Sequence, residues 1–262
     1  MSLKLQEEYG NDLNVLLVEG SRDTDIQVQQ FMVKHKWMGG RSLWTRERPF
    51  ETGLKFIPAA VLLDSSGKVL LIGHPIDLHS QIKDMIDDDL AAKKKAPKDL
   101  PDAVGKALVE FNKGGQAKAI ASLQAIVDKP PLKDTEGVVP AAQKAIDELR
   151  AKVEGEFARV QSLIDGGWYA AANDLLTQLG KSLKGNDALM KKHAEALAKL
   201  NAADLKTERD AAEAVARLEK KLWDKGPDNA TAKAFESLVE KYPGTKAAAR
   251  AQELADVARE AK

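Results

Sequence analysis

The sequence GLKFIPAAVLLDSSGKV, residues 53–69, contains a proline, an apolar run, a turn and the start of a second apolar run. Residues 60–63 and 69–72 are short and rich in leucine, valine and isoleucine, a composition typical of β-strands. The residues between them, Asp-Ser-Ser-Gly at 64–67, are common in tight turns. This stretch therefore predicts a β-hairpin that begins just after Pro58.

Regular elements are predicted on both sides of this hairpin. Upstream, residues 13–18 (LNVLLV) are typical of a buried strand, residues 26–37 have helical apolar spacing, and residues 42–45 (SLWT) form a weaker strand. The polar residues 23–25 are suited to cap the start of that helix. Downstream, residues 78–90 have the spacing of a closing helix. The predicted order, β-α-β-β-β-α, is that of a mixed α/β layer.

The pattern changes after a charged, proline-containing stretch at residues 91–100 (AAKKKAPKDL). Beyond it, alanine is abundant and every periodic segment is helical. The predicted fold class is therefore α/β plus all-α. We expect an N-terminal α/β domain at residues 1–92, a linker at 93–100 and a helical domain at 101–262.

The predicted helical domain has an apolar stripe and a faint internal repeat. Apolar residues advance by three or four positions along one segment, which predicts a helix face packed in the core: Ile146, Leu149, Val153, Phe157, Val160 and Ile164. The pattern from Gly114 to Leu123, G-x-Q-x-x-A-x-x-x-L, returns from Gly167 to Leu176 as G-x-Y-x-x-A-x-x-x-L, and more weakly from Asn229.

The residues Tyr242-Pro243-Gly244-Thr245 resemble the break between the two helices of a tetratricopeptide-like pair. The repeat copies begin at residues 114, 167 and 229, a spacing longer than the regular period of such repeats, so the region is tetratricopeptide-like and not a regular array. Helix pairs of this kind commonly bind other proteins.

Composition excludes several classes of function. The chain has 40 basic residues (lysine and arginine) and 40 acidic residues (aspartate and glutamate), so its net charge is zero. It therefore carries no electrostatic signal for nucleic acid. No stretch approaches the ~20 apolar residues that span a bilayer, which predicts a soluble chain. The chain has no cysteine, so it can form neither disulfides nor thiolate nucleophiles nor cysteine metal sites.

Residues 53–69, followed by Leu-Ile-Gly-His-Pro at 71–75 and preceded by VQQFMVKHKW at 28–37, resemble thioredoxin-like proteins of the TlpA/ResA type. The resemblance covers roughly residues 4–90. It implies a thioredoxin-like fold, a thiol–disulfide oxidoreductase ancestry, and a bacterial periplasmic or otherwise extracytoplasmic location. The Cys-x-x-Cys pair of that family is absent from this chain.

The same resemblance implies a peptide-binding site around Pro58. Pro58 matches the family's cis-proline position, and the residue before it, here Ile57, offers backbone groups to an extended substrate, with Ala59 following. Strand addition of this kind obtains affinity from backbone hydrogen bonds. We therefore expect substrate or peptide binding at Ile57, Pro58 and Ala59, and no catalytic, cofactor-binding or metal residues.

Two alignments with the family remain open. In the first, which we favour because the helix and loop lengths fit better, LNVLLV is the strand after the catalytic helix and residues 3–9 are the tail of that helix. The chain would then begin downstream of the cysteines, and its sheet would lack a central strand. In the second, residues 15–19 are the first core strand, and residues 21–24 (Ser-Arg-Asp-Thr) stand where the cysteines would be.

Other candidate sites have ordinary structural explanations. His74, Asp77 and His79 span a predicted strand end and helix start, which favours a surface loop with a helix cap over a metal site. Gly180-Lys181-Ser182 lacks the preceding glycine and strand of a phosphate-binding loop, which favours a helix end.

These observations lead to two main hypotheses. The first is a redox-inactive thioredoxin-like and helical-repeat protein that binds protein or peptide partners. The alternative is a fragment of a TlpA/ResA-type oxidoreductase whose Cys-x-x-Cys segment lies upstream. In either case an unpaired sheet edge would favour pairing with another chain, including a second copy. A third, weaker hypothesis is a purely structural helical scaffold with a decayed α/β appendage.

Overall fold

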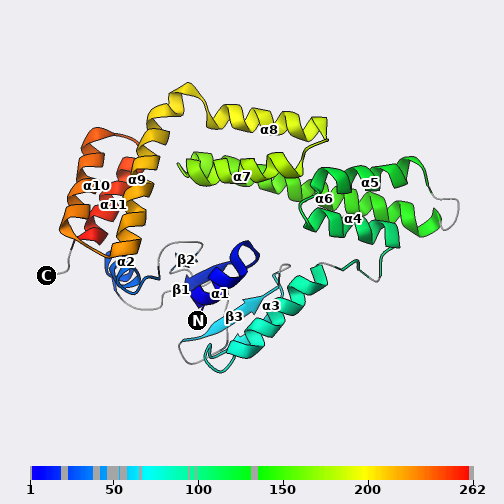
Figure 1. The fold of residues 1–262 in the computed structure, drawn as a ribbon, viewed down its shortest axis with the longest axis horizontal. Coiled ribbons are helices and arrows are strands. Elements are labelled where there is room, and N and C mark those ends of the chain that lie inside the picture. Colours follow the sequence, from blue (N-terminus) through cyan, green and yellow to red (C-terminus); the bar gives the residue numbers. More distant parts are fainter. Residues whose placement is uncertain are drawn as a thin grey trace. The chain divides into compact units, whose positions relative to one another are not determined.

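The computed structural model describes residues 2–18, 23–37, 42–45, 53, 58–64, 67–93, 95–97, 99–130 and 135–259. These residues are mostly helical, with two short pairs of strands (Figure 1). Their internal contacts divide the chain into two compact units, Met1–Leu90 together with Ala214–Lys262, and Ala91–Glu213. Residues 214–262 thus group with the N-terminal ninety residues, whereas the sequence analysis placed them with the other helices.

The first unit begins with an α/β segment. Its elements in chain order are α1 (Ser2–Tyr9), the 3-10 turn η1 (Gly10–Asp12), β1 (Val15–Val18), α2 (Asp25–Lys34), β2 (Ser42–Thr45), β3 (Ala60–Leu63), β4 (Val69–Gly73) and α3 (His79–Lys93). The predicted hairpin, the two earlier strands and both helices are confirmed. Thr24 caps α2: its side chain accepts a hydrogen bond from the Gln27 backbone N–H, while the Gln27 side chain accepts one from the Thr24 backbone N–H.

The four strands form two separate pairs. β1 pairs with β2 in parallel, from Val15 opposite Ser42 to Val18 opposite Thr45. β3 pairs with β4 in antiparallel, with an irregularity in register between Leu62 and Leu63. Among the described strands, β1 and β3 each have one partner, so the strands do not join into the single mixed sheet of a thioredoxin-like fold. That fold stays a prediction.

The remaining helices of the first unit come from the C-terminal part of the chain. They are α10 (Asn229–Lys241), α11 (Lys246–Ala258) and the part of α9 (Lys206–Lys225) that follows Glu213. The predicted break at residues 242–245 is confirmed, since Thr245 caps the start of α11. α11 packs against α10 and α2, and the Gln30 side chain on α2 donates hydrogen bonds to the backbone carbonyls of Asp256 and Arg259.

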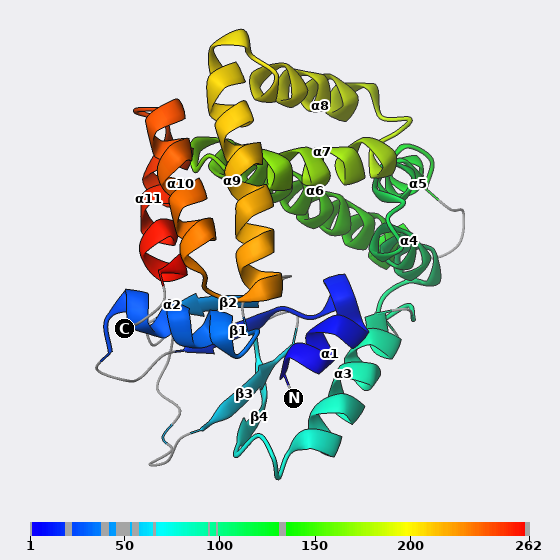
Figure 2. The same cartoon turned by 60° about the vertical axis from the view of Figure 1, so that its left-hand side comes forward.

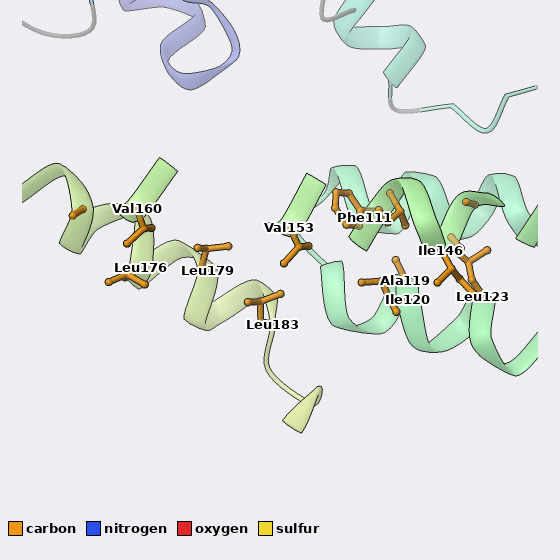
Figure 3. Close-up of a cluster of buried hydrophobic side chains, with 14 of the residues drawn as sticks. Phe111, Ala119, Ile120, Leu123, Ile146, Val153, Val160, Leu176, Leu179 and Leu183 are labelled. Carbon is orange, nitrogen blue, oxygen red and sulfur yellow. The ribbon is translucent and has the colours of Figure 1, made fainter. Parts of the chain in front are cut away.

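The second unit is entirely helical in its described residues. Its elements are α4 (Asp102–Asn112), α5 (Gln116–Asp128), α6 (Thr135–Asp165), α7 (Tyr169–Ser182), α8 (Asp187–Leu200), the 3-10 turn η2 (Ala203–Leu205) and the start of α9. The predicted apolar stripe lies on α6 and faces the core, as Figure 3 shows for Ile146, Val153 and Val160. Phe157 is only partly buried at the edge of that core.

The first two copies of the internal repeat occupy equivalent positions. Gly114 and Gly167 have φ of +90° and +80° and end the turn before α5 and α7, a conformation that glycine adopts without strain. The alanine and leucine of each copy are fully buried: Ala119, Leu123, Ala172 and Leu176. The third copy differs, because Ala234 and Leu238 are only half-buried in α10, whereas Phe235 beside them is fully buried.

Candidate protein-binding surface

The exposed large apolar side chains of the described residues are concentrated in the α/β segment. All but Trp168 lie between residues 16 and 76: Leu16, Val18, Ile26, Phe31, Trp37, Leu63, Val69, Ile72 and Ile76. Single exposed apolar residues are common on any protein. Where such side chains lie together, they commonly mark a surface that binds another molecule. We call these nine residues the apolar surface.

β1 shows the clearest mismatch between sequence and burial. All four of its residues, Val-Leu-Leu-Val, are apolar, a composition typical of a strand covered on both faces. In the structure Val15 and Leu17 are half-buried, while Leu16 is 47% exposed and Val18 is 46% exposed. One face of this strand is therefore covered and the other is open.

The β3–β4 hairpin has the same asymmetry. Leu62 and Leu71 stand opposite each other and pack against the cluster formed by Leu5 of α1 and Ile82 and Ile86 of α3. The neighbouring cross-strand pair, Val61 and Ile72, points to the other face because side chains alternate along a strand. Ile72 is 39% exposed, so the face opposite α1 and α3 is partly open.

Helix α1 connects the two strand pairs. The buried side chain of Gln6 accepts a 2.9 Å hydrogen bond from the Val15 backbone N–H at the start of β1, and its Nε2 donates to the carbonyls of Gly10 and Leu13. The adjacent Leu5 packs with α3 and the hairpin. Figure 2 shows α1 beside α3, with β1 and the hairpin both close to α1.

Polar contacts strengthen the pairing of α1 with α3. The Tyr9 hydroxyl donates a 2.9 Å hydrogen bond to Asp87 Oδ1, and Lys83 Nζ lies 2.5 Å from Glu8 Oε1. Burial, together with the hydrogen bond and charge of Asp87, raises the pKa of Tyr9 to about 12. Glu8 likewise raises the pKa of the Lys83 ammonium.

Exposed aromatic rings gather at the end of α2. The Phe31 ring lies 4.3 Å from the His35 ring and 5.4 Å from the Trp37 ring, centroid to centroid. Lys36 has a positive φ of 56°, and Trp37 donates its backbone N–H to the Met32 carbonyl at 2.7 Å, which turns the indole back toward the helix. Phe31 and Trp37 are both exposed, so this cluster is the aromatic part of the apolar surface.

The predicted peptide-binding residues lie at the entry to β3. Pro58 and Ala59 are both exposed and lead directly into Ala60, the first residue of the strand. Ile57 lies outside the described residues. The structure therefore describes two of the three predicted residues, both exposed at the start of β3, and their role stays a prediction.

The described residues bring together no group of three histidine, aspartate or glutamate side chains that could hold a metal ion. His74 Nδ1 lies 3.9 Å from Asp77 Oδ2, the contact of a loop near a helix start. Gly180-Lys181-Ser182 forms the last turn of α7, as expected of a helix end.

Two buried polar side chains of the second unit were missed by the sequence analysis. His193 on α8 makes a 2.9 Å hydrogen bond to the Leu176 carbonyl on α7. Gln116 on α5 accepts a 3.0 Å hydrogen bond from Ser182 and donates to Glu156. These hydrogen bonds join neighbouring helices within their packing, so the contacts are structural.

Comparison with known proteins found no matching family model, no matching curated protein and no matching solved structure. Within the described residues, no helix combines the length and apolar character that crossing a membrane requires. The functional argument therefore depends on this chain alone.

Proposed function

We propose that the chain is a redox-inactive, thioredoxin-like and helical-repeat protein that binds protein or peptide partners. The observation that carries the proposal is the apolar surface, which leaves Leu16 and Val18 open on a strand of interior composition. Burial of such side chains against a partner releases about 25 cal/mol per Å² of apolar area, which makes them favourable contacts. Without cysteine, the chain binds its partner and leaves the partner's disulfides unchanged.

Several features support the thioredoxin-like part of this proposal. The α/β segment keeps the predicted element order, its first two strands are parallel, and its last two are antiparallel. α1 and α3 pack on one face of the hairpin. Pro58 and Ala59 stand where an extended peptide would meet the start of β3, so they are included in the proposed binding surface.

The helical unit is proposed as a second platform. The equivalent packing of its first two repeat copies supports a tetratricopeptide-like arrangement of helix pairs. Its exposed surface contains one large apolar side chain among the described residues, Trp168. The α/β segment is therefore the proposed primary contact.

The proposal is tested with a permanently unfolded probe, reduced and carboxymethylated lactalbumin labelled with a fluorophore. We expect binding by the intact chain, measured as fluorescence anisotropy, and at least tenfold weaker binding by the double variant Leu16→Asn, Val18→Asn. Trp168→Ser is the matched control, because Trp168 is as exposed as Val18, at 46%, but lies in the other unit. Equal loss in both variants, or no binding by the intact chain, would overturn the proposal.

A second variant examines the predicted peptide site. Pro58→Ala removes a ring that is exposed and lies outside the buried clusters, so the fold is expected to persist. Binding of the same probe should weaken by about threefold or more if the entry to β3 takes part. Unchanged affinity would remove Pro58 and Ala59 from the surface while leaving Leu16 and Val18 in it.

A further inference from the structure

We propose that the end of α2 binds an acidic segment of the partner that contains an aromatic residue. This inference rests on the proposed binding function and names the chemistry of the partner. The site is the basic–aromatic cluster, which we define as Phe31, Lys34, His35, Lys36 and Trp37. These residues occupy the last turn of α2 and the turn that follows it, and all five are exposed.

The chain leaves α2 through a turn in which two backbone N–H groups point back to the last carbonyls of the helix. The Lys36 N–H donates to the Val33 carbonyl at 3.0 Å, and the next N–H, of Trp37, donates to the Met32 carbonyl at 2.7 Å. This pair of hydrogen bonds is the Schellman motif, which commonly brings the residue at the position of Trp37 into apolar contact with the helix. Here that contact places the Trp37 ring 5.4 Å from the Phe31 ring, edge to face.

The same turn ends α4 and α6, but there its strained position is occupied by glycine. Gly114 and Gly167 have φ of +90° and +80°, and each donates its N–H to the carbonyl three residues earlier. At the end of α2 the equivalent residue is Lys36, the one non-glycine residue with a positive φ in the described part of the chain. Glycine adopts this conformation freely, whereas lysine does so at a cost in stability. Strain of this kind is concentrated at functional sites, so Lys36 is a candidate for a binding role.

The lysines of the cluster lie beside the rings and offer their charges to a partner. Lys34 is three residues after Phe31, so the two side chains are neighbours on one face of α2. Within the described residues, Lys34 and Lys36 form no ion pair and no side-chain hydrogen bond. The acidic residue of α2, Asp25, lies in its first turn at the other end. The helix dipole favours a cation in the last turn, which accounts for Lys34 but requires no strained lysine at position 36.

Charge and rings together specify the occupant. A carboxylate of the partner would pair with Lys34 or Lys36. An aromatic side chain beside it would pack on Phe31 and Trp37, which are 49% and 43% exposed. An anionic membrane or a nucleic acid is bound through a broader basic surface, on the order of 4–8 lysines or arginines for a membrane. This cluster has two lysines in a chain of zero net charge, which favours a short acidic segment of a protein.

The test uses the full chain and a short peptide of paired phenylalanines flanked by aspartates, labelled with an uncharged fluorophore. We expect binding of this acidic peptide, measured as fluorescence anisotropy, and a decrease in its affinity as salt is added. The control peptide has lysine in place of every aspartate and should bind at least tenfold more weakly. A second control peptide keeps the aspartates and replaces the phenylalanines by serine, and it should also bind more weakly.

The variant Lys36→Gly separates binding from folding. It removes one charge and relieves the strained φ, so it should unfold at a higher temperature and yet bind the acidic peptide about threefold more weakly. The double variant Lys34→Gln, Lys36→Gly should bind about tenfold more weakly than the unsubstituted chain. Its matched control is Lys181→Gln, Lys184→Gln, which removes two exposed lysines in and just after the last turn of α7, in the other unit. That control should bind normally.

A further pair of variants examines the rings. Trp37→Ser removes an exposed indole and should weaken binding of the acidic peptide by about threefold or more. Trp168→Ser is the matched control, because Trp168 follows Gly167 in the turn after α6 just as Trp37 follows Lys36, and its N–H also donates back to its helix. Equal loss in the two variants would show that the rings of the cluster have no special part, which would overturn the inference.

The outcomes separate this inference from the proposed function. Binding of the lactalbumin probe, together with equal affinity of the unsubstituted chain and Lys34→Gln, Lys36→Gly for the acidic peptide, would overturn the inference and leave the proposed function standing. Equal binding of the acidic and the lysine peptide would overturn it as well, because charge would not select the segment. Absence of acidic-peptide binding, with binding of phosphatidylserine vesicles or of oligothymidine that the double variant abolishes, would assign the cluster to a membrane or a nucleic acid and overturn it.

Discussion

The side chain of Gln6 holds the first residue of β1: its Oε1 accepts a 2.9 Å hydrogen bond from the Val15 backbone N–H. The same amide donates to the carbonyls of Gly10 and Leu13, so it replaces the strand and helix partners that this bend in the chain lacks. One buried glutamine therefore sets the direction in which the chain leaves α1 and enters β1.

Substitution of Gln6 by alanine should destabilise the chain by about 2 kcal/mol, since buried backbone groups would lose their partners. The loss is measured as a decrease in the free energy of unfolding in urea. Gln143→Ala is the control, because Gln143 is exposed and its amide donates to Asp147 on the same helix. A Gln6 variant no less stable than the Gln143 variant would contradict the role given to Gln6.

The Tyr9–Asp87 contact predicts a loss of stability at alkaline pH. The pKa of the Tyr9 phenol is raised from 10.0 to about 12 in the folded chain, so folding favours the neutral phenol. This contribution is complete below pH 10 and is lost as the pH rises from 10 to about 12. We expect the Tyr9→Phe variant to have a flatter decline in unfolding free energy over that interval than the unsubstituted chain. An identical slope in the two proteins would contradict this assignment.

Local elements were predictable from the sequence because their signals lie within a few residues. The turn at residues 64–67 and the apolar runs beside it specify the β3–β4 hairpin. Thr24 and Gln27 specify the start of α2 through side chains three residues apart. The stripe on α6 repeats with helical spacing, so its burial follows from the pattern alone.

Long-range contacts were not predictable in the same way. The packing of α2 against α11 joins residues far apart in the chain, and the hydrogen bonds from Gln30 to the carbonyls of Asp256 and Arg259 carry no local sequence signal. The surface on β1 had a partial signal: LNVLLV indicated an interior strand. Only the structure shows that Leu16 and Val18 remain open. The contact of His193 with Leu176 likewise depends on how α7 meets α8.

Gly180 and Gly155 should respond in opposite directions to substitution by alanine. Both lie in helices, where alanine is usually favoured over glycine by about 1 kcal/mol. A Cβ at Gly155 would meet no atom within 4 Å, so Gly155→Ala should stabilise the chain. A Cβ at Gly180 would lie 2.9 Å from His193 Nε2, which is held by its bond to the Leu176 carbonyl.

We therefore expect Gly180→Ala to destabilise the chain by about 1–3 kcal/mol, the range for overpacking a core. Thermal unfolding followed by circular dichroism provides the measurement, with Gly155→Ala as the control of opposite sign. The destabilisation caused by Gly180→Ala should be smaller in a His193→Ala background, where the imidazole is absent, than in the unsubstituted chain. If the cost of that alanine is the same in both backgrounds, the clash is not with His193.

Asp228 predicts an acid-dependent loss at the start of α10. Its Oδ2 accepts a 2.6 Å hydrogen bond from the Thr231 hydroxyl and its Oδ1 a 2.7 Å hydrogen bond from the Thr231 backbone N–H. These bonds, the hydroxyl first, lower the pKa of the Asp228 carboxyl below 3.8. The stabilisation is therefore complete above pH 3.8 and is lost as the pH falls through the lower value in the folded chain.

Asp228→Ala should reduce the free energy of unfolding by about 1 kcal/mol at neutral pH, the usual cost of losing a helix cap. The difference between the variant and the unsubstituted chain should shrink in acid, because protonation weakens the same cap. Asp228→Ser is the conservative control, since a serine hydroxyl can accept the Thr231 N–H bond but carries no charge. It should retain most of the stability at neutral pH and lose the acid dependence, whereas a serine variant as unstable as the alanine variant would mean that the charge, and not the cap geometry, stabilises α10.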